Sequence, residues 1–147
     1  MKCVIASDHA GVDLKQFVKT YLESKGVDVE DLGPADKSRV DYPDFARKVA
    51  ARIVEDASLF GVLICGTGIG ISMSANRFKG VRAALCHDAY TASMAKAHND
   101  ANVLCMGARV IGEGTCESIL DAWLATGFEG GRHSGRVQKI EQHGDVL

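Results

Sequence analysis

The 147-residue sequence has little excess charge and lacks the features of several specialised classes of protein. Its 17 Lys and Arg nearly balance 19 Asp and Glu, giving a net charge of −2, so the basic surplus typical of nucleic-acid-binding proteins is absent. No apolar run approaches the roughly 20 residues that a membrane-spanning helix needs, and no signal-peptide pattern is present. We therefore expect neither a nucleic acid nor a membrane as a partner.

Cysteine is present, but not in the patterns of a disulfide framework or a zinc site. The five cysteines are odd in number, widely spaced and contain no C-x-x-C pair. This usage favours a reducing, cytoplasmic location. The sequence also has no internal repeat, low-complexity tract or linker, and its length suits one domain with a substantial core. We expect a single domain over residues 1–147.

Strand-like and helix-like patterns alternate along the chain. The runs typical of strands lie at 2–7, 27–32, 62–64, 81–86 and 101–106. Helical patterns are predicted from 14 to 22, 42 to 53, after 70, 88 to about 97, 119 to 124 and 137 to 143. Such alternation predicts an α/β protein, a three-layer α/β/α sandwich around a five-stranded parallel Rossmann-like sheet. The polar loop 33–41 is the one internal stretch expected to be mobile.

The third strand runs into a glycine-rich loop that begins with a cysteine. Cys65 is followed by glycines at 66, 68 and 70, and then by residues that tolerate a helix. A helix start leaves N–H groups free to bind an anion, and it can lower a cysteine pKa. A thiol beside an anion pocket suggests proton abstraction next to a carbonyl, although a strand-end cysteine is also often a buried core residue.

Further candidate residues follow the ends of other elements. Ligands of open parallel sheets bind beyond the carboxyl ends of the strands, where the winding direction reverses. If the first and third strands are neighbours, Asp8, His9 and Cys65 share one crevice. Asp8 also fits a simple helix N-cap. The triplet His98, Asn99 and Asp100 is predicted to form a turn, either purely structural or catalytic.

Arginines near the C-terminus suit a phosphate group. Arg132 and Arg136 are four residues apart, so a helix would place both guanidinium groups on one face, where they can grip a phosphate. Surface arginines that contact only solvent are the commoner explanation of such a pair. Arg109, between flanking glycines, is a third candidate.

Seven short motifs together resemble the type B ribose-5-phosphate isomerases, a family that also includes allose-6-phosphate and galactose-6-phosphate isomerases. In chain order they are SDHAG at 7–11, DYP at 41–43, ICGTGIGIS at 64–72, HND at 98–100, NV at 102–103, GAR at 107–109 and GGRH at 130–133. They are spread in order over nearly the whole chain.

The resemblance implies an aldose–ketose isomerase that uses no metal or other cofactor and works through a cis-enediol. It implies that Cys65 is the base, as in the cysteine-using branch of the family, and that His98, with Asp8, opens the sugar ring. The donors around the enediolate would then be Thr67, Gly66, Gly68 and Gly70. Sugar oxygens would be bound by Tyr42 and Asn99, and the phosphate by His9, Arg109, Arg132 and Arg136.

The resemblance also implies a homodimer, or a dimer of dimers, with shared active sites. His98, Asn99 and Arg109 would come from the partner subunit, on which residues from about 128 to 147 would pack. Ribose 5-phosphate and ribulose 5-phosphate, of the pentose phosphate pathway, are the expected substrates. Six-carbon sugar phosphates remain an alternative, as does a flavodoxin-like module that only binds a phosphorylated ligand. A cysteine phosphatase is disfavoured because position 71, six residues after Cys65, is Ile rather than Arg.

Overall fold

The computed structural model describes residues 1–142 and has a parallel sheet of five strands, in the order β2-β1-β3-β5-β4. The strands are β1 (Lys2–Ser7), β2 (Asp28–Asp31), β3 (Leu59–Cys65), β4 (Ala83–Leu85) and β5 (Val103–Gly107). Because β1 lies between β2 and β3, the winding direction reverses between β1 and β3. The predicted adjacency of the first and third strands is confirmed.

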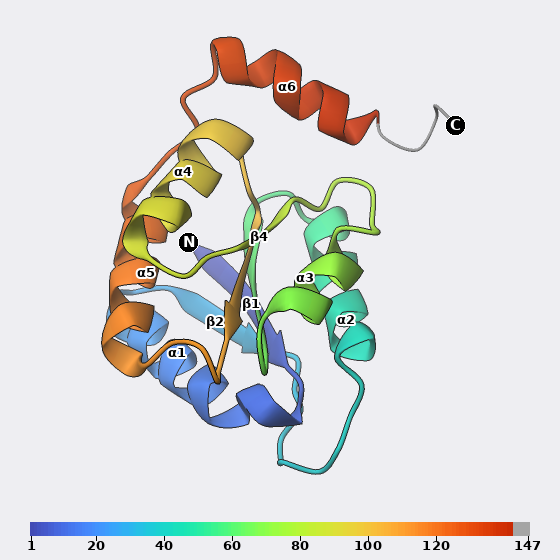
Figure 1. Cartoon of the computed structure of the whole chain (residues 1–147), viewed down its shortest axis with the longest axis vertical. Coiled ribbons are helices and arrows are strands. Elements are labelled where there is room, and N and C mark those ends of the chain that lie inside the picture. The colour runs from blue at the N-terminus through green and yellow to red at the C-terminus, as the bar shows by residue number, and fades with distance from the viewer. Residues whose placement is uncertain (143–147) are drawn as a thin grey trace.

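Helices cover both faces of the sheet, as Figure 1 shows. The helices are α1 (Val12–Ser24), α2 (Tyr42–Glu55), α3 (Ile69–Ala75), α4 (Ala89–Asn99), α5 (Glu113–Ala125) and α6 (Arg132–Glu141), with a short 3-10 helix, η1 (His9–Gly11), after β1. One apolar core joins the sheet to α1, α4 and α5, and a second joins it to α2 and α3. Only α6 stands apart, beyond α4. The predicted three-layer α/β/α sandwich is confirmed.

The cores follow from alternation along the central strands. In β3, Val62 and Ile64 face the core of α1, α4 and α5, whereas Leu63 and Cys65 face that of α2 and α3. Every residue of β3 is buried, because helices lie on both faces of a parallel sheet. The last residue of β3, Cys65, is thereby fixed at the carboxyl edge with its side chain on the α2 and α3 side.

Three predicted boundaries are wrong. Helix α5, predicted from 119 to 124, begins at Glu113. Helix α4 continues through His98 and Asn99, and only Asp100 leaves it, with φ of +47°; His98 and Asn99 are therefore helical rather than in a turn. Helix α6 begins at Arg132, five residues before the predicted start at 137. Gly135 lies within it on an exposed face, where glycine costs about 1 kcal/mol relative to alanine but does not end the helix. The predicted last residue, at 143, lies outside the described residues.

The loop 33–41 is held at several points by the rest of the chain. Lys15, a buried residue of α1, donates from Nζ to Oδ1 of Asp31 and to the carbonyl of Pro34, both at 2.7 Å. Nδ1 of His9 lies 3.3 Å from the backbone nitrogen and 3.2 Å from the carbonyl oxygen of Val40. These contacts argue against the expected mobility, and they fix the entry into α2 at Tyr42.

Within the described part of the chain, no helix is both long and apolar enough to cross a membrane.

The ion pair of Lys15 with Asp31 provides a test of this anchoring. Asp31→Ala would leave the Lys15 ammonium buried without its counter-charge. The free energy of unfolding in urea should therefore fall by about 3 kcal/mol, which is the low end for breaking a buried pair because Asp31 is partly exposed. The exposed pair of Lys37 with Asp13 is the control, and Asp13→Ala should cost less than about 1 kcal/mol. Equal effects of the two substitutions would contradict a buried anchor.

Candidate active site

Cys65 ends β3 with its sulfur turned into the glycine-rich loop. The backbone N–H of Gly68 donates to Sγ of Cys65 at an N···S distance of 3.1 Å. Gly68 has φ of +78°, a conformation that a side chain would oppose, and this geometry aims its N–H back at the sulfur. Oγ1 of Thr67 accepts from the N–H of Ile69 at 3.2 Å. Within residues 1–142, the N–H groups of Gly66 and Thr67 have no protein acceptor, so they are free to meet a ligand.

The other four cysteines have a different environment. All five thiols are free and buried, but burial raises the pKa of Cys86 to about 11 and that of Cys116 to about 12. Burial also raises the pKa of Cys3 and of Cys105 well above the ordinary range. Cys65 alone among them receives a hydrogen bond from a backbone N–H in the described structure.

Two long side chains lie over the glycines of this loop. A Cβ added to Gly70 would lie 2.6 Å from the ring of Tyr42, and one added to Gly66 would lie 3.1 Å from Nη1 of Arg109. The backbone of Arg109 also donates to the carbonyl of Gly66 at 3.0 Å. The glycines thus make room for a phenol and a guanidinium beside Cys65.

Arg109 therefore lies beside Cys65 of its own chain. This differs from its expected contribution from a partner subunit. The reason is register: β5 pairs with β3 so that Cys65 is opposite Gly107, and Arg109, two residues further on, folds back over the neighbouring loop.

Asp8 and His9 follow β1 at the same edge of the sheet. The N–H of Asp8 donates to the carbonyl of Ile64 at 3.0 Å, next to Cys65. Oδ1 of Asp8 caps η1 by accepting from the N–H groups of Ala10 and Gly11, at 2.9 and 3.2 Å. The capping role is therefore real, while Oδ2 has no hydrogen-bond partner within the described chain. Asp8, His9 and Cys65 therefore follow two neighbouring parallel strands at the carboxyl edge of the sheet.

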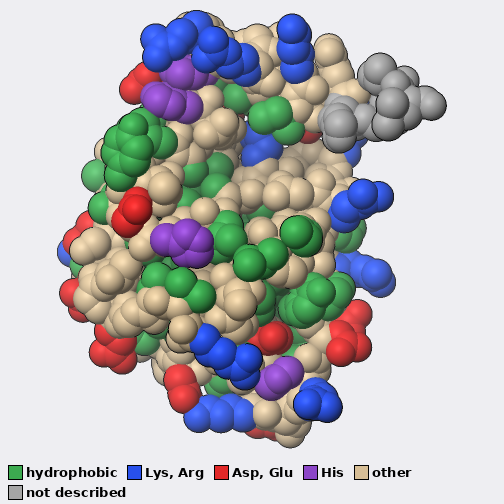
Figure 2. Space-filling model, in the orientation of Figure 1, with side chains coloured by type: hydrophobic (Ala, Val, Ile, Leu, Met, Phe, Trp, Pro, Cys, Tyr) green, Lys and Arg blue, Asp and Glu red, His purple; other side chains and the backbone are tan. Residues whose placement is uncertain are grey.

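The remaining predicted residues lie at the opposite edge. A crossover helix runs antiparallel to the strands that it connects, so α4 ends at the amino edge of the sheet, where it places His98 and Asn99 (Figure 1). Helix α6, with Arg132 and Arg136, packs against this end of α4. Figure 2 shows Lys, Arg and His side chains gathered there. One chain therefore holds two halves of the predicted site, separated by the sheet.

The second half is organised around two imidazoles. The rings of His98 and His133 stack with centroids 4.2 Å apart and planes 12° from parallel. Oε2 of Glu129 lies 3.9 Å from Nε2 of His98 and 3.5 Å from Nε2 of His133. Burial, the His98 ring and Arg132 lower the pKa of His133. Sequence reasoning missed Glu129 and the buried His133; their spacing of four residues was the available signal.

Arg82 joins the ends of α4 and α6. It donates from Nε to the carbonyl of Asp100 at 2.8 Å and from Nη2 to Oδ2 of Asp100 at 3.2 Å. Nη1 donates to Oε1 of Glu141, and the N–H of Gly80 donates to Oε2 of the same residue at 3.1 Å. Sequence reasoning missed this arginine as well, because its partners lie 18 and 59 residues away.

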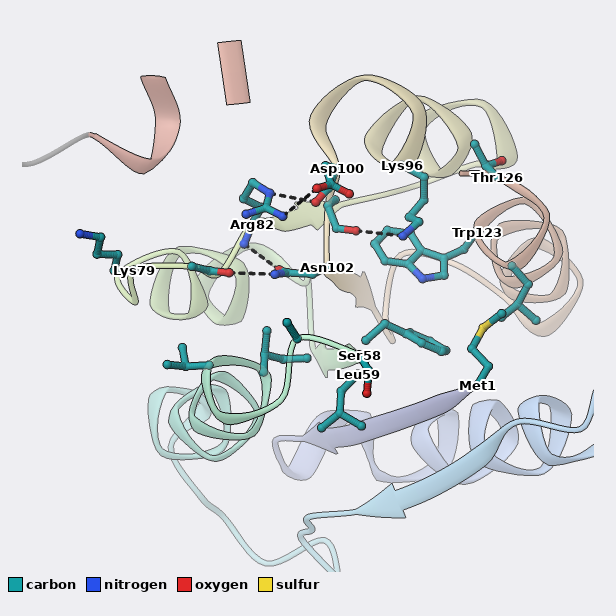
Figure 3. A pocket seen from close by; sticks show the side chains of 17 residues that line it. Met1, Ser58, Leu59, Lys79, Arg82, Lys96, Asp100, Asn102, Trp123 and Thr126 are labelled. Atoms are coloured by element: carbon teal, nitrogen blue, oxygen red, sulfur yellow. Dashed lines mark hydrogen bonds and ion pairs between the residues drawn. The ribbon is translucent and has the colours of Figure 1, made fainter. Parts of the chain in front are cut away.

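A cavity of about 570 Å³ opens at the amino edge, next to Arg82 and the end of α4 (Figure 3). Two of its cationic side chains already have partners: Arg82 binds Asp100, and Nζ of Lys96 lies 5.1 Å from the centroid of the Trp123 ring. The residues that line this cavity were not predicted to bind a ligand, and the cavity lies across the sheet from Cys65.

The fold and the Cys65 loop define a doubly wound α/β protein in which a thiol and two backbone N–H groups without protein acceptors lie together at the strand reversal. Comparisons with known proteins agree. A family model described as Ribose/Galactose Isomerase matches residues 3–140. Ribose-5-phosphate isomerase B of Escherichia coli is 44% identical over 139 residues, which cover 95% of this chain and 93% of that protein. The chain belongs to the ribose/galactose isomerase family.

Solved structures support this membership. Ribose-5-phosphate isomerase B of Clostridium thermocellum aligns with a TM-score of 0.94 at 45% identity, covering 97% of this chain and 96% of that one. The enzyme of Mycoplasma genitalium, solved with bound ribulose-5-phosphate, aligns with a TM-score of 0.94 at 42% identity, covering 99% of this chain and 97% of that one.

The anchor of α6 can be tested by removing Glu141. Glu141→Ala leaves Arg82 with one carboxylate partner and frees the N–H of Gly80. We expect faster amide hydrogen exchange across 132–141 and a loss of about 1.5 kcal/mol in the free energy of unfolding. This value is at the lower end for a charge-assisted hydrogen bond because Glu141 is partly exposed. Lys139→Ala, an exposed site on the same helix, should change neither; unchanged exchange in Glu141→Ala would show that α6 is held by other contacts.

Proposed function

We propose that this protein is an aldose–ketose isomerase that interconverts ribose 5-phosphate and ribulose 5-phosphate through a cis-enediolate. The observation that carries the proposal is the N–H of Gly68 donating to the sulfur of Cys65 beside two unoccupied N–H donors. Removal of a proton next to a carbonyl needs a base and stabilisation of the oxygen that gains charge. The choice of ribose 5-phosphate and ribulose 5-phosphate as substrates rests on the relatives named above, one of which was solved with ribulose-5-phosphate.

In the proposed reaction, the thiolate of Cys65 takes the proton from C2 of the open-chain aldose. The C2–H electrons form the C1=C2 bond, and the former carbonyl oxygen becomes an enediolate oxygen. The N–H groups of Gly66 and Thr67, with the Thr67 hydroxyl, are suited to stabilise that charge. The thiol then returns the proton to C1, while the C2 hydroxyl passes its own proton to the enediolate oxygen on C1. C2 becomes the carbonyl and C1 carries the hydroxyl, which gives the ketose. Gly68 and Gly70 keep the loop open to the sugar, with the Tyr42 ring lying over Gly70.

We further propose that the active site is completed by a second subunit. The two halves of the predicted site lie at opposite edges of one sheet, and a C2 dimer can set the carboxyl edge of each chain against the amino edge of the other. His98 of one chain would then open the sugar ring, with Asp8 of the other, and Asn99 would bind a sugar oxygen.

The phosphate in this proposal is held by groups from both edges. Arg132 and Arg136, on one face of α6, would meet His9 and Arg109 of the partner chain. Three guanidinium charges and the His9 imidazole suit a phosphate dianion, and fixing it orients the reacting carbons. In this proposal α6 packs on the partner subunit. The reaction belongs to the pentose phosphate pathway and takes place in a reducing cytoplasm, a location that suits a protein with five free thiols.

Substitution of Cys65 tests the base. Cys65→Ala should reduce kcat by at least about 1000-fold, because the proton-transferring group is lost, while inhibition by a non-isomerisable sugar phosphate stays within about threefold. Cys86→Ala, at another buried free cysteine, is the matched control and should retain activity. The assay should compare ribose, allose and galactose phosphates. Substantial turnover by Cys65→Ala would remove the thiol from the mechanism.

Mixed dimers test the shared site. Cys65→Ala and His98→Ala, each inactive alone, should regain about one quarter of wild-type activity when co-refolded in equal amounts, since half the dimers are mixed and each holds one intact site. A mixture of Cys65→Ala with Arg109→Ala should show no more activity than the average of the two variants alone, because these two residues lie in the same half and no mixed dimer gains an intact site. Recovery in the second mixture alone would place Arg109, and not His98, across the interface.

A further inference from the structure

Three metal-ligating side chains meet where α4 ends and α6 begins. The imidazoles of His98 and His133 and the carboxylate of Glu129 offer one ligand atom each, and these atoms all lie within 4.8 Å of one another. The proposed isomerase chemistry uses only His98 of the three. Glu129 and His133 are therefore left without a role beyond contact with it.

The most buried member of this cluster has an unmet polar atom. His133 is 5% exposed, and its Nε2 has no hydrogen-bond partner within the described residues. That nitrogen points toward Glu129, whose Oε2 is 3.5 Å away, too far for a hydrogen bond. A buried polar atom without a partner costs free energy, and a ligand that binds it would recover that cost.

Neutral imidazole and carboxylate are the nitrogen and oxygen ligands that zinc prefers, and a His₂–carboxylate set leaves a fourth position open. We propose that His98, Glu129 and His133 form a binding site for a divalent zinc-type ion. Zinc bonds of about 2.0–2.1 Å require ligand atoms roughly 3.3 Å apart, so the three must draw together. Glu129 is exposed and free to move, whereas the stacked rings must splay for both lone pairs to reach one ion.

Nearby charge limits the affinity of this site. Arg132 and Arg136 lie on the same helix as His133 and oppose a dication, while the Glu129 carboxylate favours it. The ion should therefore bind more weakly than in a closed structural zinc site. Because His98 would be a ligand, an ion bound here takes its lone pair away from proton transfer. Zinc is thus expected to inhibit the isomerase at the concentration at which it binds.

Direct binding of Zn²⁺ tests the site independently of the isomerase proposal. Zinc binding should be measured on the full chain carrying Cys65→Ala, which removes thiolate binding at that residue, by competition with a chromogenic chelator in phosphate-free buffer. We expect one Zn²⁺ per chain. Co²⁺ in its place should give the visible d–d absorption of a four-coordinate nitrogen and oxygen site, without thiolate charge-transfer bands.

Substitutions in the same background identify the ligands. Changes that only re-orient a metal ligand cost about 10–100-fold in affinity, so Glu129→Gln and His98→Ala should each weaken Zn²⁺ at least about 10-fold. His87→Ala, at an exposed histidine at the other end of α4, should change nothing. Glu129 is on the surface, so Glu129→Gln is expected to fold even if substitution of the buried His133 does not. Absence of bound Zn²⁺, or equal affinity in Glu129→Gln and in the unsubstituted background, would overturn the proposal.

Discussion

The direction of the chain in a parallel sheet is the constraint on which the rest of this structure depends. Strands that run the same way require each crossover helix to run back, so the residues after β3 and those at the end of α4 lie at opposite edges. Cys65 and His98 are separated by the sheet, whatever the side chains around them. The motifs of the family follow one another along the sequence, but because of this alternation of direction they lie at two opposite edges of the sheet.

Each half of the site has its own local support. At the carboxyl edge, register against β5 and a left-handed glycine hold one N–H on the Cys65 sulfur. At the amino edge, Arg82 ties Asp100 at the end of α4 to Glu141 at the end of α6. Neither half depends on contacts from the other. In the proposed dimer, each half would therefore be formed within one chain, and association of two chains would bring them together.

The fold could be predicted from the sequence because strand and helix patterns alternate with clear breaks, and the adjacency of β1 and β3 followed from winding alone. The errors have a common cause. The predicted turn at His98 and Asn99 and the predicted start of the last helix at 137 are wrong because local propensity takes no account of tertiary contacts. The position of Arg109 depends on the β5 register, and the role of Arg82 depends on Asp100 and Glu141, which are distant from it in sequence; no local pattern encodes either. Glu129 differs, because it lies only four residues before His133.

Exposed apolar side chains at the carboxyl edge of the sheet give separate support to the proposed dimer. Ile69 and Met73 on α3, Tyr90 at the start of α4 and Val110 beside Arg109 are all large, apolar and exposed. All four follow the carboxyl ends of strands, so they lie toward the same edge of the sheet as the Cys65 loop. Scattered exposed apolar residues are ordinary, but a group around a thiol and two unoccupied N–H donors is costly to leave in water. A partner edge carrying α6 would cover these side chains and exclude water from the enediolate, so the apolar rim and the divided site have one physical explanation.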